Sequence, residues 1–118
     1  MDLNAWLAQI RKGAAEMAVL LILERGEQYG LEIISSFDAS PNLGVAEGTV
    51  YPLLSRLSKA GRISSRWVTD GDTAHARKYY QLTEEGRATL AEMRKEWARF
   101  RDALDDLCDA SRKGRRSA

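Results

Sequence analysis

The sequence predicts a mainly α-helical fold that carries one small β-hairpin. Four segments repeat apolar residues at helical spacing, and two β-rich runs flank a turn that contains Gly71. The composition is that of a globular chain, with 44% hydrophobic and 30% charged residues. A length of 118 residues fits one domain with an appended helix.

The first two predicted helices lie in the N-terminal third of the chain. The first has Asn4 as its N-cap residue and ends before Gly26. From Met17 onward this helix is apolar nearly all round, so we expect that half to be buried. A second, shorter helix is predicted for residues 28–37, followed by turn residues up to Gly44.

A third helix is predicted for residues 46–60, with Gly61 as the residue that ends it. At 100° per residue, one narrow face is apolar and the opposite face is mostly polar. The apolar face consists of Val50, Leu53, Leu54 and Leu57. The opposite face and its flanks carry Gly48, Thr49, Tyr51, Pro52, Ser55, Arg56 and Lys59. Because proline removes a helix hydrogen bond, Pro52 predicts an irregular first turn or a start nearer to Val50.

The hairpin is predicted from strands at residues 63–69 and 78–83, joined through Asp70-Gly71-Asp72 and residues 73–77. A hairpin alone is marginally stable, so we expect it to pack on the helices. Thr83 then offers a hydroxyl N-cap for a fourth helix that runs to about residue 110.

The fourth helix carries an apolar seam with successive spacings of 3, 4, 3, 4 and 3 residues. Its members are Leu90, Met93, Trp97, Phe100, Leu104 and Leu107. The helix could fold back on its own domain, but we favour packing against a second copy, which makes this seam a dimer interface. Residues 111–118 hold only basic charged residues and are predicted to be a frayed tail. The expected organisation is a domain at 1–83, a dimerisation helix at 84–110 and a basic tail at 111–118.

Three helices followed by a hairpin is the element order of a winged helix-turn-helix, in which the third helix enters the DNA major groove. The side chains of the third helix expected to reach bases or phosphates are Thr49, Tyr51, Ser55, Arg56 and Lys59. The hairpin, or wing, supplies Arg66, Arg77 and Lys78 for phosphate or minor-groove contacts.

Basic residues are concentrated in the segment that this interpretation assigns to DNA. The formal net charge of the chain is only +1. Residues 1–47 hold three cations and seven acids, and residues 48–83 hold six cations and two acids. The near-zero total therefore averages an acidic N-terminal segment with a basic reading segment.

Three ordered segments resemble the signatures of the PadR family of bacterial transcriptional regulators. They are Tyr29-Gly30-Leu31-Glu32-Ile33, the run from Glu47-Gly48-Thr49 to Ser55-Arg56-Leu57, and Arg77-Lys78-Tyr79-Tyr80-Gln81-Leu82-Thr83-Glu84-Glu85-Gly86. The single C-terminal helix is similar to that of the smaller PadR subgroup. The resemblance implies a homodimeric repressor in the bacterial cytoplasm, which binds a pseudo-palindromic operator on double-stranded DNA and is released by an effector.

The tryptophans leave a second interpretation open. Some members of the small PadR subgroup resemble drug sensors, in which an indole from each subunit flanks a planar aromatic ligand. Trp97 is placed for that role or for plain packing in the seam, and Trp6 could close the same interface. Trp67 is expected in the core. The alternative function is thus a small-molecule sensor or a protein-interaction adaptor built on the same scaffold.

Several other classes of protein are not expected. The chain has no nucleophile-elbow, Walker or dinucleotide-binding motif, so we predict no enzyme and no cofactor. His75 and Cys108 are the only residues of their kinds, which disfavours a metal site and excludes an intrachain disulfide. The longest apolar run is far shorter than a membrane span, so we expect a cytoplasmic protein with no membrane partner.

Overall fold

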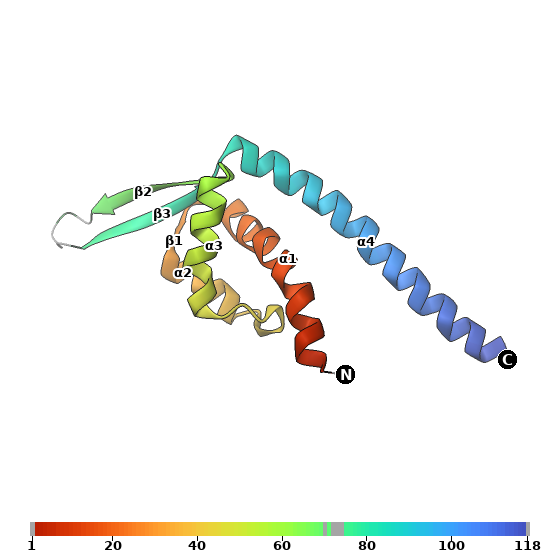
Figure 1. Ribbon diagram of the computed structural model, residues 1–118. Coiled ribbons are helices and arrows are strands. Elements are labelled where there is room, and N and C mark those ends of the chain that lie inside the picture. The colour runs from red at the N-terminus through yellow and green to blue at the C-terminus, as the bar shows by residue number, and fades with distance from the viewer. Residues whose placement is uncertain (1, 70, 72–74, 118) are drawn as a thin grey trace.

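A computed structural model describes residues 2–69, 71 and 75–117, with side chains described up to Arg112 (Figure 1). The residues are arranged as a helical domain, a hairpin that projects to one side, and a long helix that leaves on the other. This confirms the predicted mainly α-helical fold with a winged helix-turn-helix and a long C-terminal helix. Apart from Gly71, the turn predicted at residues 70–74 lies outside the described residues.

Helix α1 (Leu3–Glu24) begins one residue before the predicted N-cap, Asn4. The Asp2 carboxylate caps it by accepting a hydrogen bond from the Asn4 N–H at 2.9 Å, so the assignment of Asn4 as the cap is wrong. The second half of α1 is buried as predicted, with Val19 and Leu20 completely covered.

The segment predicted as one helix at residues 28–37 contains a strand and a helix. Strand β1 (Gln28–Tyr29) pairs antiparallel with β3 (Ala76–Leu82), and helix α2 (Gly30–Asp38) follows β1 directly. The Tyr29 N–H donates to the Glu32 carboxylate at 3.2 Å, which fixes the start of α2 at Gly30. The hairpin of β2 (Ile63–Thr69) and β3 is therefore part of a three-stranded sheet in the order β1-β3-β2.

Helix α3 (Glu47–Lys59) follows a short 3-10 turn, η1 (Pro41–Leu43). Its bounds agree with the prediction, because Ala46 and Ala60 are the flanking cap residues. The helix begins at Glu47 rather than near Val50, and its first turn includes a tight bond from the Thr49 N–H to the Ala46 carbonyl at 2.9 Å. Pro52 leaves the Gly48 carbonyl without its helical donor, at an exposed position where water can replace it.

Strands β2 (Ile63–Thr69) and β3 (Ala76–Leu82) form the wing. Only the base of the wing is buried, through Ile63, Tyr80 and Leu82, while the rest projects beyond the helices (Figure 1). Trp67 lies in the projecting part and is 68% exposed, so its predicted place in the core is wrong.

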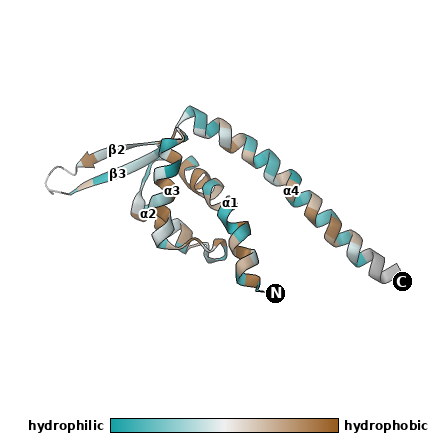
Figure 2. Ribbon diagram, in the orientation of Figure 1, coloured by the Kyte–Doolittle hydropathy of each residue, from teal (hydrophilic) through white to brown (hydrophobic). Residues whose placement is uncertain are grey.

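Helix α4 (Glu84–Ser117) begins as predicted, with the Thr83 hydroxyl accepting a hydrogen bond from the Gly86 N–H at 2.9 Å. It continues past residue 110, so the predicted frayed tail from residue 111 is wrong. Leu90 is 1% exposed in the core of its own chain, and Met93 packs against that core. Leu90 is therefore corrected from dimer seam to domain core, whereas Met93 is only half-buried and its place in the seam stays a prediction. Figure 2 shows hydrophobic and hydrophilic residues interspersed along the helix beyond them.

A set of close contacts joins α4 to the domain, which we call the α4 joint. The Arg62 guanidinium donates to the Thr89 hydroxyl at 2.6 Å, and the Thr83 hydroxyl donates to the Gly61 carbonyl at 2.6 Å. Gly86 packs directly on the Arg62 carbonyl oxygen, where a Cβ atom would overlap it. These contacts set the direction in which α4 leaves the domain, at an angle to α1 (Figure 1).

Candidate nucleic-acid interface

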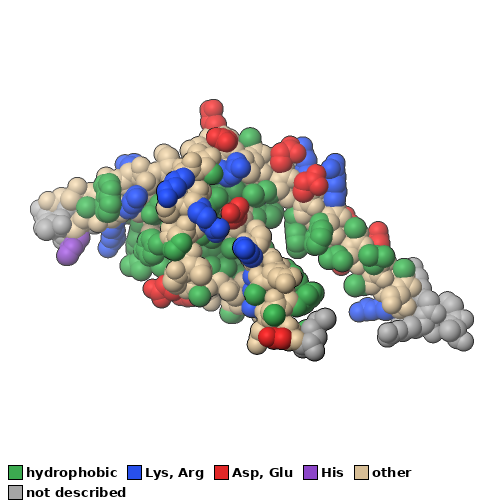
Figure 3. Space-filling view, viewed as in Figure 1, with side chains coloured by type: hydrophobic (Ala, Val, Ile, Leu, Met, Phe, Trp, Pro, Cys, Tyr) green, Lys and Arg blue, Asp and Glu red, His purple; other side chains and the backbone are tan. Residues whose placement is uncertain are grey.

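The side of α3 turned away from the core forms an exposed ridge. Val50, Leu53, Leu54 and Leu57 are at most 2% exposed and dock the helix, as predicted. The predicted DNA-contacting residues of α3 are all exposed, namely Thr49, Tyr51, Ser55, Arg56 and Lys59. Figure 3 shows lysine and arginine side chains gathered over α3 and along the wing on one face of the molecule.

Two of these side chains already have structural partners. The Thr49 hydroxyl donates to the Ala46 carbonyl at 2.7 Å, which leaves its oxygen available only as an acceptor. The Tyr51 ring covers Gly30 so closely that a Cβ there would lie 2.8 Å from the ring carbon Cε1. Tyr51 is nevertheless 50% exposed, so it contributes both to packing and to the surface beside the wing.

A cleft of about 430 Å³, the wing cleft, separates α3 from the wing. Its walls are mainly aromatic and basic, formed by Tyr29, Tyr51, Trp67, Arg77, Lys78 and Tyr80. The Arg77 guanidinium lies 4.8 Å from the centre of the Tyr29 ring, and the Lys78 ammonium lies 5.8 Å from the centre of the Trp67 ring. Cation–π attraction of this kind orients both cations at the cleft while their side chains remain exposed.

Tyr79 and Tyr80 point to opposite faces of β3, as strand alternation predicts. Tyr80 is buried, and this burial, followed by the neighbouring Tyr51, raises the pKa of its phenol. Tyr79 is half-buried and packs edge-on against Tyr29, with ring centres 5.4 Å apart. The tyrosine pair therefore holds the wing on the helices.

Arg66, which the sequence suggested as a phosphate contact, is paired with an acid on the surface. It forms two hydrogen bonds with the Glu27 carboxylate, at 2.6 and 2.8 Å. These bonds lower the pKa of Glu27 and raise the pKa of Arg66. The pair ties the wing to the loop that follows α1.

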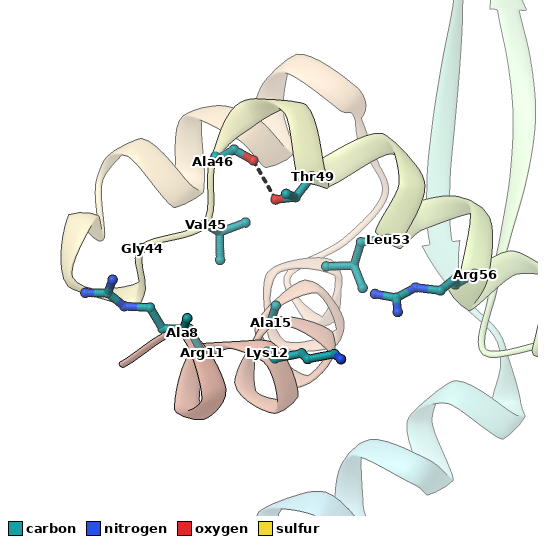
Figure 4. Close-up of a pocket in the computed structure, with 10 residues that line it drawn as sticks. All are labelled: Ala8, Arg11, Lys12, Ala15, Gly44, Val45, Ala46, Thr49, Leu53 and Arg56. Atoms are coloured by element: carbon teal, nitrogen blue, oxygen red, sulfur yellow. Dashed lines mark hydrogen bonds between the residues drawn. The ribbon is translucent and has the colours of Figure 1, made fainter. Parts of the chain in front are cut away.

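A second cleft, the α1–α3 cleft, has a volume of about 310 Å³ and lies on the other side of the α3 ridge (Figure 4). Three cations line it, Arg11 and Lys12 from α1 and Arg56 from α3. The sequence interpretation missed Arg11 and Lys12, because it counted them with the acidic N-terminal segment. Proximity to α3 could be found only from the fold, since these residues lie more than 30 positions before it.

Comparison with known proteins agrees with this architecture. Residues 19–92 match the model of the transcriptional regulator PadR-like family. The chain belongs to the PadR family. A PadR-like transcription factor from Bacteroides fragilis is 33% identical, with a TM-score of 0.72 over 85% of this chain and 95% of that chain. A PadR family regulator from Eggerthella lenta is 31% identical, with a TM-score of 0.76 over 89% of this chain and 90% of that one.

A DNA complex is among the structures similar to this PadR-family chain. Bacillus subtilis PadR, solved with operator DNA, is 30% identical, with a TM-score of 0.61 over 68% of this chain and 45% of that chain. The PadR assignment confirms the family resemblance and the DNA-binding winged-helix fold.

In this PadR-family chain, the seam residues of α4 that follow Met93 are not covered by the domain of the same chain. Trp97, Phe100, Leu104 and Leu107 are between 45% and 69% exposed. The first half of α1 presents a similar set of exposed apolar residues, Leu3, Trp6 and Ile10. These two apolar surfaces lie on helices that diverge away from the sheet (Figure 1).

The remaining candidate residues are also exposed. His75 lies near the end of the wing, and Cys108 lies on α4 as a free thiol. Within the described part of the chain, no three His, Cys, Asp or Glu side chains are grouped as a metal site would require. None of the described helices is long and apolar enough to span a membrane.

Proposed function

We propose that this protein is a homodimeric bacterial repressor that binds a pseudo-palindromic operator in the cytoplasm and is released by an effector. The observation that carries the proposal is the exposed ridge of α3 between two clefts that both contain cations. The B-DNA major groove is about 12 Å wide and admits one helix. A phosphate backbone borders it on each side, so a central helix with basic flanks matches its charge and shape.

Within this arrangement, the side chains proposed to contact DNA fall into two roles, one on α3 and one on the wing. Ser55, Arg56 and Lys59 are free at the surface and can reach base edges, with Arg56 able to form a bidentate pair with guanine. Arg77 and Lys78 on the wing would bind phosphate or enter the adjacent minor groove.

The exposed apolar residues of α4 support dimerisation. A helix this exposed gains little stability from its own chain, and a row of large apolar side chains favours burial against a partner. The residues proposed for the dimer interface are Trp97, Phe100, Leu104 and Leu107, with Trp6 on α1 at its edge. Two joined copies would present their α3 helices to half-sites about one DNA turn apart.

The proposal is tested by fluorescence anisotropy with an operator selected from random duplexes by the wild-type protein. Arg56→Ala is expected to weaken binding by about 10- to 100-fold if it pairs with a base. Lys95→Ala is the matched control, because it removes the same charge from α4, where the Lys95 ammonium lies 3.4 Å from the Glu92 carboxylate. No duplex binding by the wild type would refute the proposal, and equal affinity of Arg56→Ala and wild type would remove Arg56 from the contacts.

A planar aromatic effector is the second candidate function, and the exposed pair of Trp97 and Phe100 favours it. Their ring centres are 6.1 Å apart with planes tilted by 31°, which leaves an aromatic surface on one side of α4. In a dimer, two such surfaces would lie near the seam and could enclose a flat ligand.

Titration with planar aromatic dyes, followed by tryptophan fluorescence, tests this candidate. Quenching should be lost in Trp97→Ala and retained in Trp67→Phe, which removes an indole from the wing instead. Equal quenching in wild type and Trp97→Ala would place the ligand elsewhere. If this chain bound neither DNA nor dye but bound another protein, that result would support the alternative function as a protein-interaction adaptor.

A further inference from the structure

The α1–α3 cleft has the composition of an anion-binding surface. Its floor is formed by small and apolar side chains that include Ala15, Val45 and Leu53, and its charged lining residues are Arg11, Lys12 and Arg56. No acid is among its lining residues, and Glu47, the nearest acid on α3, is not part of the wall. Three cations without a carboxylate repel one another, so the site is electrostatically incomplete without an anion.

Lys12 and Arg56 are placed to act on the same group. Figure 4 shows their side chains entering the cleft from opposite walls, Lys12 from α1 and Arg56 from α3. Lys12 is exposed, and no hydrogen bond or ion pair engages either side chain within the part of the chain that the structure describes. An oxyanion between them would receive donors from both sides.

Arg11 closes the far end of the cleft. Its side chain lies on Gly44, where a Cβ atom would come within 2.5 Å of the guanidinium carbon and 2.6 Å of Cδ. Gly44 has a φ of 64°, so both its conformation and its lack of a side chain accommodate Arg11. The Arg11 Nε is buried and has no hydrogen-bond partner among the described residues. Such a donor is rare in folded proteins. Because this atom is buried, Arg11 contributes positive charge to the cleft and no direct bond from Nε to an anion.

The position of the cleft relative to the α3 ridge identifies the anion. Counted from Val50 at 100° per residue, Thr49 and Arg56 lie at about 260° and 240°, on the α1 side of the ridge. Tyr51 lies at about 100°, on the wing side. With the ridge in the major groove, one phosphate backbone passes over the wing cleft and the other over the α1–α3 cleft.

We infer that the α1–α3 cleft binds a phosphate diester of the operator backbone, on the side of the major groove opposite the wing. Lys12 is its direct partner, Arg56 can add an N–H donor that its pair with guanine leaves unused, and Arg11 adds positive charge at the Gly44 end of the cleft. This inference rests on the proposed DNA-binding function and extends it, because it assigns helix α1 a role in binding DNA. The net negative charge of residues 1–47 gives no indication of that role.

The salt dependence of DNA binding tests the inference. Phosphate contacts are sequence-independent, so a mixed-sequence duplex of about three helical turns is a sufficient probe. Removing one phosphate contact should lower the slope of log affinity against log salt by about 0.9 per protomer. Lys12→Gln should therefore lower the slope, Lys12→Arg should restore it, and Lys95→Gln, which makes the same change of charge on α4, should leave it near the wild-type value.

Each result has a distinct meaning. Failure of the wild type to bind any duplex would overturn the proposed function and the inference together. Duplex binding with the same slope in wild type and Lys12→Gln would overturn the inference alone. On the selected operator, replacing one phosphate by a neutral methylphosphonate should weaken wild-type binding and leave Lys12→Gln much less affected. Equal losses at every phosphate for the two proteins would also overturn it.

Discussion

Leu90 and Leu104 lie on the same heptad seam, yet the structure predicts different consequences when each is shortened to alanine. Leu90 is 1% exposed and lies within the core cluster, whereas Leu104 is 48% exposed and extends from the domain. Truncation of a fully buried leucine removes its transfer free energy and leaves a cavity, which together cost about 3 to 5 kcal/mol. The free energy of unfolding of Leu90→Ala should fall by that amount, a large part of the stability of a small domain.

Leu104→Ala should instead weaken the association of two copies. At a protein concentration below the dimer dissociation constant, its free energy of unfolding should stay within about 0.5 kcal/mol of the wild-type value. At higher concentration it should lose the part of the stability that dimer formation contributes. Urea unfolding at several protein concentrations, with sedimentation equilibrium for the dissociation constant, separates the two effects. Equal loss of monomer stability in both variants would refute the division of the seam into core and interface.

Four further substitutions test individual positions. Gly86→Ala should lower the free energy of unfolding by about 1 to 3 kcal/mol, because its Cβ overlaps the Arg62 carbonyl. Gly13 has open space around it in α1, so Gly13→Ala should raise the free energy of unfolding by about 0.5 to 1 kcal/mol. If urea unfolding showed Gly86→Ala to be more stable than Gly13→Ala, that result would contradict the packing at the α4 joint. The Arg66 pair lowers the pKa of Glu27 from 4.5, so its stabilisation is present above that pH and is lost as pH falls through the lower folded value. Glu27→Gln should therefore lose less stability than wild type between about pH 5 and pH 3, and parallel curves from urea unfolding would contradict this coupling. Trp67→Ser should change the free energy of unfolding by less than about 1 kcal/mol, whereas a loss of several kcal/mol would show that the indole is buried after all.

The division of α3 into docking and exposed faces was predictable from sequence. Its apolar and polar residues alternate at the helical period over three turns, and this period alone determines which residues share a face. Gly61 and Thr83 were likewise predictable as helix boundaries, because each acts through its own backbone or its nearest neighbours.

Features that depend on distant residues were not predictable in this way. Strand β1 has two residues, too few to display a period, and exists because Tyr79 and Tyr80 pair with it. The seam period continues unchanged from Leu90 to Leu107, so the spacing cannot show where the domain core ends. Trp67 has the composition of a core residue, but its exposure depends on how far the wing projects beyond the helices.

At the candidate site, too, the distribution of charges along the sequence does not show which cations lie together in the fold. Arg11 and Lys12 stand in an acidic segment of the sequence, but the fold places them with Arg56 in one cleft whose lining residues include no acid. Arg66 stands in the basic segment, but Glu27 neutralises it across 39 positions of the sequence. Counting charges along the chain locates the reading helix, and only the fold shows which cations remain available to DNA.

Because α4 is long, a small rotation at the α4 joint moves the far end of the helix by a large distance. Its 34 residues span about 51 Å at 1.5 Å per residue. Among the described residues, its polar contacts with other elements lie between Glu85 and Arg94, close to one end. A rotation of roughly 5° at that end would carry the other by about 4 Å, more than the 3.4 Å or so between successive base pairs. If two copies are joined through the far ends of their α4 helices, a rotation of this size at Gly86 and Arg62 is enough to shift the two α3 helices by a full base-pair step.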